Sequence, residues 1–433
     1  MKENLQGQIS NSNKTPRTKH QPATSRARLE FGVWIFFGIW CLGFGISAPL
    51  HGADWFQWRG PNRDGISAEK GWFAELPAEG PKQLWKAGNL GIGWSSVSVA
   101  GGRVFTMGNT GEVDTVFCFD ANTGAEVWKH TYDCSSKDPN GYPGPRSTPT
   151  VDANRVYTVS RRGHLFCLDA ATGKVVWSKN FKADFQSDPP TWGFAGSPVI
   201  DGNNLIVEVG GSGTALVALN KTTGTVVWKN GSDRPGYGSP VVFGAGAQRG
   251  VAVFHAKAVV GYSLANGKEL WRHSWETAYD VNAATPIVVG DKVFISSGYG
   301  HGCALLQVGP GGSRVLWENK NMKNHMNACV LLGEHLYGFD EGELKCLDFK
   351  TGEMKWKTGK YGKGSLMAAD GKLIILGDRG RLGFATVTPD SYQELSSASV
   401  LSDRDVWAAP VLANGKIYCR SKSDLVCIDV SKK

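Results

Sequence analysis

The sequence predicts an all-β protein, an eight-bladed β-propeller of four-stranded antiparallel blades. Glycine and tryptophan are frequent, with 56 Gly and 16 Trp in 433 residues, which is typical of many tight turns and many flat packing side chains. A strand–turn–strand pattern recurs along the chain after residue 53, and a second such pattern precedes each copy. Hydrophobic residues make up 41% and charged residues 20%, which provides a core and excludes a disordered or collagen-like chain.

The first repeat is represented by VFCFDANTGAEVW, residues 116–128. An Asp, Asn or Ser lies four positions before a glycine, and the glycine lies four positions before a tryptophan. The first residue opens a turn by binding its own backbone, and the glycine takes the positive-φ position. This spacing indicates two strands joined by a tight turn. Five copies keep both spacings: residues 116–128, 165–177, 216–228, 259–271 and 344–356.

Three further copies depart from this pattern. One ends at Trp317 with its glycines displaced, and another, residues 382–395, has no tryptophan. The eighth copy, LVCIDV at 425–430, is followed by three residues and has no second strand. QLWKAG, around Trp85, supplies a spare strand near the other end of the chain. We therefore expect the Trp85 strand to complete the last blade, since ring closure protects the blade edges.

The second pattern consists of a small-residue step, a short strand, a turn and another strand, as in STPTVDANRVYTVS from residue 147. It occurs eight times, so each unit has four strands and about 47 residues, within the roughly 40–50 of propeller blades. We therefore predict one propeller domain over residues 54–433.

The residues before the propeller have the pattern of an export segment. Residues 1–30 carry six basic and two acidic side chains, and the twenty residues 31–50 carry no charge. This predicts a cytoplasmic basic region over 1–30 and a signal peptide or transmembrane anchor over 31–53, with cleavage left open. The propeller is then expected outside the cytoplasm, periplasmic or membrane-anchored.

The distribution of charge and the cysteines bear on binding partners and on disulfide formation. About half of the formal charge of +8 lies in residues 1–30, so the remainder gives no reason to expect nucleic-acid binding. We expect a monomer.

Four cysteines share one repeat position where small residues also occur, which predicts buried free thiols at Cys118, Cys167, Cys346 and Cys427. One disulfide among Cys134, Cys303, Cys329 and Cys419 is left open.

The repeat resembles the tryptophan-docking repeat of the pyrroloquinoline quinone (PQQ) propeller superfamily, which includes quinoprotein alcohol dehydrogenases and the assembly scaffold BamB. WRGPNRDG, residues 58–65, is similar to uncharacterised exported PQQ-like proteins of planctomycete-type bacteria. The resemblance implies that each repeat tryptophan docks between blades near a turn glycine. The structural docking residues would be Trp85, Trp128, Trp177, Trp228, Trp271, Trp317 and Trp356.

One residue lies three positions before each small-residue step, where the chain of a propeller enters its innermost strand. These eight side chains should ring one mouth of the channel: Trp94, Arg146, Ala195, Tyr237, Ala283, Met326, Lys363 and Trp407, with Trp192, Asn282, Asn324 and His325 close by. Aromatic faces and two cations would suit an acidic planar ligand such as PQQ. The predicted ligand-binding residues are Trp94, Arg146, Trp192, Tyr237, Asn282, His325, Lys363 and Trp407.

The repeat, the export segment and the resemblance together suggest two alternative functions. The first is an exported, BamB-like binding or scaffold module for a protein, peptide or small ligand at its rim or channel. The alternative is a PQQ-dependent quinoprotein oxidoreductase acting on an alcohol or sugar. Calcium, which serves PQQ in that family, takes six to eight oxygen ligands that usually include acids. None of the eight ring positions is Asp or Glu. The sequence therefore favours the binding module. It indicates no metal ligand and no catalytic residue. PQQ with calcium is expected only if the alternative function holds.

Overall fold

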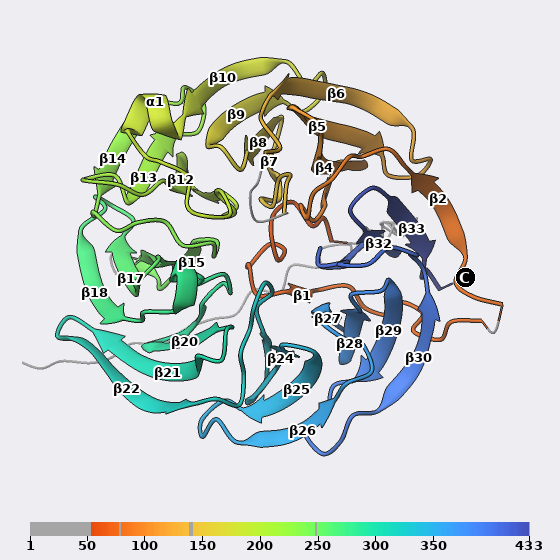
Figure 1. Cartoon of the computed structure of the whole chain (residues 1–433). Coiled ribbons are helices and arrows are strands. Elements are labelled where there is room, and N and C mark those ends of the chain that lie inside the picture. The colour runs from red at the N-terminus through yellow and green to blue at the C-terminus, as the bar shows by residue number, and fades with distance from the viewer. Residues whose placement is uncertain (1–52, 78, 138–141, 247–248, 433) are drawn as a thin grey trace, which may run out of the picture. The chain divides into compact units, whose positions relative to one another are not determined.

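The computed structural model describes residues 53–77, 79–137, 142–246 and 249–432. Within this part, eight antiparallel sheets follow one another around a ring, as Figure 1 shows. We number them blades 1 to 8 in chain order, beginning with the blade of β3. This confirms the predicted eight-bladed propeller. The predicted basic region and most of the predicted signal or anchor lie outside the described residues. Among the helices of the described residues, none has the length and apolar character to cross a membrane.

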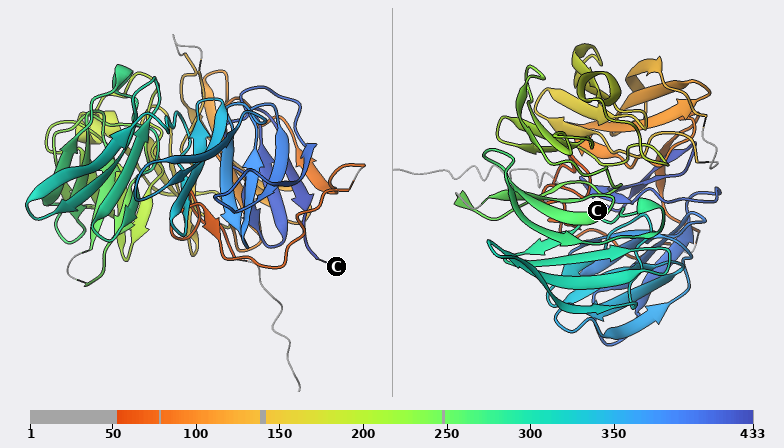
Figure 2. Two further views of the ribbon diagram at one scale, coloured as in Figure 1. Left: turned by 90° about the horizontal axis from the view of Figure 1, so that it is seen from below. Right: turned by 60° about the vertical axis from the view of Figure 1, so that its left-hand side comes forward.

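The strands are short, and each blade runs from an inner strand beside the channel to an outer strand at the rim (Figures 1 and 2). Blades 1 to 4 contain β3 (Ser98–Ala100), β4 (Arg103–Thr110), β5 (Val113–Asp120), β6 (Glu126–Asp133), β7 (Thr150–Asp152), β8 (Arg155–Val159), β9 (His164–Asp169), β10 (Val175–Asn180), β11 (Val199–Asp201), β12 (Asn204–Glu208), β13 (Leu216–Asn220), β14 (Val226–Asn230), β15 (Val241–Phe243), β16 (Gly250–Phe254), β17 (Ala258–Ser263) and β18 (Glu269–Ser274).

The remaining blades repeat this order. Blades 5 to 8 contain β19 (Ile287–Val289), β20 (Lys292–Ser297), β21 (Gly302–Gly309), β22 (Gly312–Asn319), β23 (Val330–Leu332), β24 (His335–Asp340), β25 (Glu343–Asp348), β26 (Met354–Thr358), β27 (Ser365–Ala369), β28 (Lys372–Leu376), β29 (Arg381–Thr386), β30 (Glu394–Ser399), β31 (Val411–Ala413), β32 (Lys416–Arg420) and β33 (Leu425–Asp429). Two strands from the start of the propeller, β1 (Ile66–Ser67) and β2 (Gln83–Ala87), join blades 7 and 8. A short helix, α1 (Phe181–Phe185), and a 3-10 turn at Ala278–Asp280 interrupt the loops.

The repeated turns form as their sequence predicts. Asp120 Oδ1 accepts hydrogen bonds from the backbone N–H of Asn122 at 2.9 Å and of Thr123 at 2.8 Å. Gly124 then adopts a φ of 71°, a left-handed conformation that side chains disfavour. The turns at Asp169, Asn220 and Asp348 repeat these bonds. The turns thereby fix the register between the third and fourth strands.

The outer-strand tryptophans join neighbouring blades. Trp128 of blade 1 donates its indole N–H to the carbonyl of Ala170 in blade 2 at 3.0 Å. Its ring lies against Gly173, where a Cβ would approach it to 2.5 Å. Five further tryptophans donate to a carbonyl of the next blade: Trp85, Trp177, Trp228, Trp317 and Trp356. Trp271 faces the blade with displaced glycines, and it packs on Phe243 at a centroid distance of 5.8 Å.

The ring closes through blade 8, as predicted. Strand β2 pairs antiparallel with β33, and Trp85 lies opposite Cys427. The last blade therefore takes its outer strand from the start of the propeller. Apolar side chains of adjacent sheets pack against each other between blades; one such cluster joins Tyr157 and Leu165 of blade 2 with Leu205 and Leu219 of blade 3. All eight cysteines of the described residues are buried free thiols, and the disulfide left open above is not formed.

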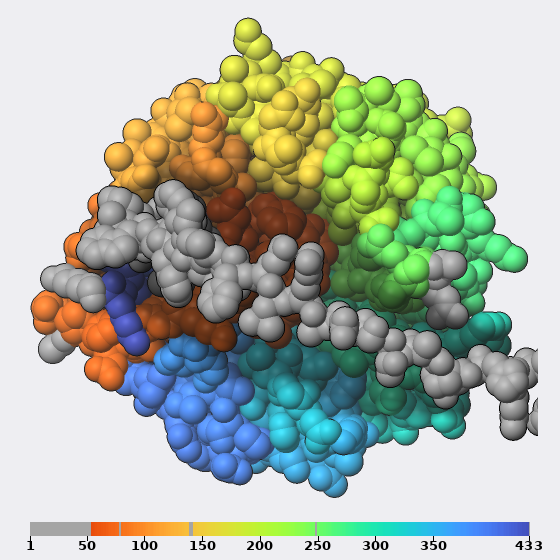
Figure 3. Space-filling view, turned by 180° about the vertical axis from the view of Figure 1, so that it is seen from behind, coloured from red at the N-terminus to blue at the C-terminus, as the bar shows by residue number. Residues whose placement is uncertain are grey.

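Residues 54–69, which we call the axial segment, cross the centre of the ring, a feature that the repeat pattern does not predict. From behind, these residues lie in the middle of the blades (Figure 3). Arg59 donates to the carbonyls of Ala328 at 3.3 Å and Cys329 at 2.6 Å, and Arg63 donates to the carbonyl of Pro240 at 2.7 Å and to that of Pro198. Burial lowers the pKa of Arg59 to about 10 and that of Arg63 to about 9.

The axial segment contacts every blade. Strand β1 pairs in parallel with β27 of blade 7 and extends that sheet to five strands. Other bonds reach the remaining blades: Trp55 to Val99 in blade 1, Phe56 to Val151 in blade 2, Arg63 to Ser197 in blade 3 and to Pro240 in blade 4, Trp58 to Thr285 in blade 5, Arg59 to Cys329 in blade 6, and Glu69 to Gly415 in blade 8. The segment thus fills the channel and ties the blades together along their axis.

Candidate functional site

A cavity of about 260 Å³ opens at one mouth of the channel. It lies where the loops between blades enter the innermost strands, and Trp58 of the axial segment closes its inner end together with Ser197 and Ser239. All eight ring positions named from the sequence line this cavity: Trp94, Arg146, Ala195, Tyr237, Ala283, Met326, Lys363 and Trp407. The equal spacing of these residues before each step places them together, because each blade repeats the same entry geometry.

Seven of the eight predicted ligand-binding residues line the cavity, and Asn282 does not. Asn282 is fully buried, and its Nδ2 donates to the carbonyls of His255 at 2.9 Å and Ala256 at 3.0 Å. Asn324, named as a neighbour, is likewise buried and donates to the carbonyl of Phe339 at 2.9 Å. Both amides therefore hold loop backbone in place. That the seven others bind a ligand stays a prediction.

One wall of the cavity is a group of stacked aromatic rings flanked by a cation. Trp94 and Trp407 stack with centroids 5.4 Å apart and an interplanar angle of 22°, and Tyr142 lies 5.9 Å from Trp407. The Arg146 guanidinium lies 5.3 Å from the Trp94 centroid, a cation–π distance. The Trp94 indole donates to the carbonyl of Asp405 at 3.1 Å, which fixes its orientation. This wall is positively charged at its edge.

The opposite wall contains Trp192, Tyr237 and Tyr299, and a chain of aromatic contacts continues from it along the rim to Tyr279, which does not line the cavity. Trp192 contacts Tyr237 and Tyr279, each at a centroid distance of 5.9 Å, and Tyr279 contacts Tyr299 at 5.5 Å. Tyr279 and Tyr299 have φ values of 61° and 54°. Such left-handed conformations cost about 1–2 kcal/mol for a side-chain-bearing residue and are concentrated at functional sites. These backbone conformations place the two tyrosine rings at the cavity mouth in spite of their energetic cost.

A titratable group lies on the wall contributed by blades 6 and 7. Lys363 Nζ contacts Glu341 Oε2 at 2.9 Å and His325 Nδ1 at 3.4 Å. Burial and the neighbouring Lys363 charge lower the pKa of His325, and Glu341 partly offsets them. Burial would raise the pKa of Glu341, but its hydrogen bond to Lys363 and that lysine's charge lower it. The lysine is thus held in place by an acid beside the cavity.

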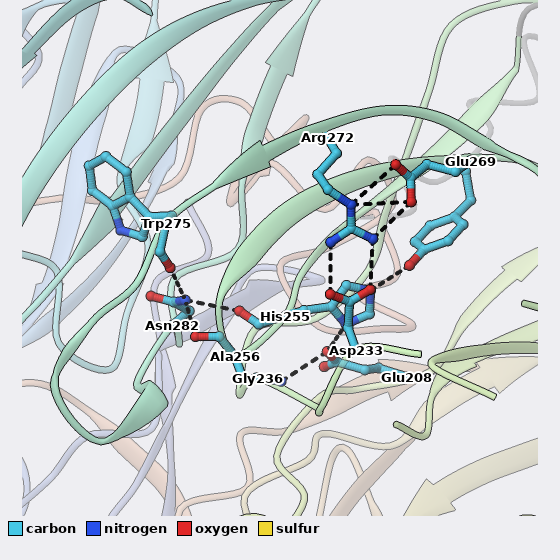
Figure 4. A network of polar contacts seen from close by, with 10 residues as sticks. Glu208, Asp233, Gly236, His255, Ala256, Glu269, Arg272, Trp275 and Asn282 are labelled. Carbon is cyan, nitrogen blue, oxygen red and sulfur yellow. Dashed lines mark hydrogen bonds and ion pairs between the residues drawn. The ribbon is translucent and has the colours of Figure 1, made fainter. Parts of the chain in front are cut away.

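A buried polar network supports the loops of the mouth (Figure 4). His255 Nδ1 lies 2.7 Å from Glu208 Oε1, and its Nε2 lies 2.9 Å from the Tyr262 hydroxyl. The same Glu208 oxygen accepts a bond from the backbone N–H of Gly236 at 2.9 Å, next to Tyr237. Arg272 binds Asp233 through two hydrogen bonds of 2.8 and 2.9 Å, which raise the pKa of the guanidinium. These contacts fix the loop that carries Tyr237 to the cavity.

Several lining residues were not predicted from the sequence: Trp58, Tyr142, Ser197, Ser239, Val281, Tyr299 and Asn327. Trp58 belongs to the WRGPNRDG motif, which lies outside the repeat and carries no spacing that places it at the cavity. Tyr142 and Tyr299 lie in loops, so their positions depend on loop conformation. Ser197 and Ser239 belong to the small-residue steps, so the same repeat could have identified them. They follow the ring positions in the chain and lie further into the channel.

The donor set does not favour a metal site. Among the described residues, no three His, Cys, Asp or Glu side chains gather in a cluster that could hold a metal ion. The described lining of the cavity contains no carboxylate; its charged residues are Arg146 and Lys363, with His325 titratable. A calcium ion, which needs several oxygen ligands and usually acids, does not fit these residues.

Comparison with known proteins identifies the family. The family model described as outer membrane protein assembly factor BamB matches residues 114–358, more than half of the chain. The protein therefore belongs to this family of PQQ-like β-propellers. Among curated protein sequences, none matches the chain significantly.

Solved structures share the fold at low sequence identity. BamB from Moraxella catarrhalis is 16% identical with a TM-score of 0.58, covering 80% of this chain and 99% of that one. Quinohemoprotein alcohol dehydrogenase from Comamonas testosteroni is 13% identical with a TM-score of 0.61, covering 88% and 81%. The computationally designed Ika8 protein is 13% identical with a TM-score of 0.56, covering 85% and 99%. BamB, an alcohol dehydrogenase and a designed protein share this fold, so function has to be argued from the site.

Proposed function

We propose that the protein is an exported binding module that takes an acidic ligand into the cavity at the channel mouth. The observation that carries the proposal is the lining: aromatic rings and two cations, with no carboxylate among the described lining residues. Pockets with apolar walls and a few polar groups bind small molecules, and a recessed cation attracts anions. Export is inferred from the charge-free residues 31–50 that follow a basic stretch.

The axial segment supports a binding role for this mouth. Trp58 closes the cavity at its inner end, and Arg63 lies beneath it, donating to the carbonyl of Ser197 at 3.2 Å. The buried guanidinium adds positive charge behind the cavity floor, which favours an anion at the mouth.

The test is a binding screen with PQQ, acidic sugars and short acidic peptides. Because Lys363 is paired with Glu341, Lys363→Gln should be combined with Glu341→Gln to avoid leaving an unpaired carboxylate. Arg146→Gln is the second variant. A hydrogen bond to a charged group contributes about 1.5–3 kcal/mol, so each variant should weaken binding by about 10- to 100-fold. Rising salt should also weaken binding to the wild type.

Lys422→Gln combined with Asp405→Asn is the matched control, which likewise leaves no unpaired carboxylate. The Lys422 Nζ lies 6.0 Å from the Trp94 centroid and pairs with Asp405 at 2.6 Å, but it does not line the cavity. This variant should bind as the wild type does, and tryptophan fluorescence should change on binding in both. If all variants bind every ligand found in the screen with equal affinity, the two cations do not contribute to binding and the proposal is contradicted.

A PQQ-dependent oxidoreductase is the second candidate, supported by the shared fold of the alcohol dehydrogenase and by the aromatic cavity. The residues present do not fit its calcium ion, so we derive no catalytic step. Dye-linked oxidation of alcohols or sugars after addition of PQQ and calcium would establish this candidate in place of the first.

A further inference from the structure

We propose that the acidic ligand is a carbohydrate that carries carboxylates, with one uronate ring in the cavity and the next ring on the tyrosines of the rim. This inference rests on the proposed function and specifies its ligand. Three features of the mouth carry it: exposed aromatic faces, neutral hydroxyl and amide groups, and the limited volume of the cavity.

The rim presents exposed aromatic rings where the chain could have placed polar side chains. Tyr279 is 67% exposed, Tyr299 42% and Tyr142 41%. Two of these three are held at positive φ, at an energetic cost. Clustered apolar faces in water mark contact surfaces. The apolar C–H face of a pyranose ring packs on such faces, while the tyrosine hydroxyls remain available to its oxygens.

The floor and one side of the cavity provide neutral polar groups. The Ser239 hydroxyl oxygen accepts a bond from the backbone N–H of Ser197 at 2.9 Å, and the Ser197 hydroxyl oxygen accepts one from Thr148 at 2.9 Å. Each serine still has its own O–H to donate. Asn327 donates to the carbonyl of Trp407 at 3.1 Å, and its side-chain oxygen can accept. A ligand rich in hydroxyl groups satisfies these positions, whereas a purely aromatic acid would desolvate them without replacement.

The volume of the cavity limits what can enter. At about 260 Å³ it lies below the roughly 300–1,000 Å³ of pockets for drug-sized ligands. A single sugar ring is therefore the unit that the cavity takes, with its carboxylate toward Arg146. A longer chain continues onto Tyr299 and Tyr279, which lie 5.5 Å apart at the rim.

The experiment uses the full chain and calorimetric titration with galacturonate, trigalacturonate, and the neutral galactose and trigalactose. We expect trigalacturonate to bind about tenfold more tightly than galacturonate, and the neutral sugars to bind at least tenfold more weakly than their acidic counterparts. Tyr279→Ala should remove the gain of the trimer and leave the affinity for the monomer unchanged. Arg146→Gln should weaken both acidic probes.

Phe73→Ala is the control, because Phe73 is 43% exposed and does not line the cavity. It should leave both affinities unchanged. A tetraglutamate peptide and benzoate separate this inference from the proposed function. If either binds through Arg146 while the acidic sugars bind no better than neutral ones, the carbohydrate inference is overturned and the binding module stands. If none of the acidic sugars, tetraglutamate, benzoate or PQQ binds in a way that depends on Arg146, both are overturned.

Discussion

Single glycines determine how closely the blades can approach each other. At Gly173 the φ is 71°, and an added Cβ would meet Trp128 of the preceding blade at 2.5 Å. Two requirements therefore coincide at one residue: a left-handed backbone and the absence of a side chain. Gly371, in the turn between β27 and β28, has a nearly equal φ of 69° but no atom within 4 Å of an added Cβ.

This pair separates backbone strain from tryptophan docking. Gly371→Ala should lose about 1–2 kcal/mol of unfolding free energy, the cost of a left-handed side-chain-bearing residue. Gly173→Ala should lose that amount and about 1–3 kcal/mol more, because the methyl group displaces the Trp128 ring. Urea denaturation of both variants measures the difference. Equal losses would show that docking at this turn contributes little to stability.

At the scale of elements, the repeats were predictable because their determinants are local. The Asp-to-Gly and Gly-to-Trp spacings define a turn and its two strands, and the unpaired strand around Trp85 predicted closure with β33. The mouth residues could also be located, since each precedes its step by the same interval. Asn282 does not line the cavity, because its side chain turns toward the backbone of His255, which no spacing encodes.

The axial segment could not be predicted, because the contacts that hold it in the channel are long-range. Nothing in WRGPNRDG has a strand or helix period, and Arg63 binds carbonyls more than 130 residues away. A polar motif at the start of a repeat domain would ordinarily be placed on the surface. Here its arginines satisfy inward-facing carbonyls of several blades, a requirement that arises only once the ring is formed.

The Arg63 side chain offers a direct test of this role. Arg63→Met should leave the carbonyls of Ser197 and Pro240 unsatisfied, at about 1–3 kcal/mol for each buried group. Arg249→Met, which removes an ion pair with Asp201 on the surface, should cost at most about 1 kcal/mol. Thermal unfolding compares the two variants. A melting temperature for Arg63→Met within a degree or two of that for Arg249→Met would mean that the axial segment does not hold the blades.

At the scale of the whole propeller, the partial burial of histidines makes the unfolding free energy depend on pH. Burial lowers the pKa of five histidines below their ordinary value: His130, His164, His273, His301 and His325. The unfolded chain, whose histidines titrate near 6.5, therefore binds more protons than the folded protein as the pH falls through that value. Burial raises the pKa of Glu69 and Asp114, which acts in the opposite sense as the pH falls from these raised pKa values to the ordinary carboxyl values.

The unfolding free energy should therefore be fully present above about pH 7 and fall as the pH is lowered from 7.5 to 5.5. Below about pH 4.5 a second loss should begin, because Glu394 and Asp429 have pKa values of about 2 and hold their partners as carboxylates. Melting temperatures at constant ionic strength measure both phases. His130→Phe should make the first phase shallower, since His130 packs on Phe166 at 5.0 Å and its protonation is opposed by burial. Val127→Ala, a change on the same strand that does not titrate, should leave the slope unchanged. A melting temperature that is constant as the pH falls from 7.5 to 5.5, or that rises, would show that the half-buried histidines do not govern stability in this range.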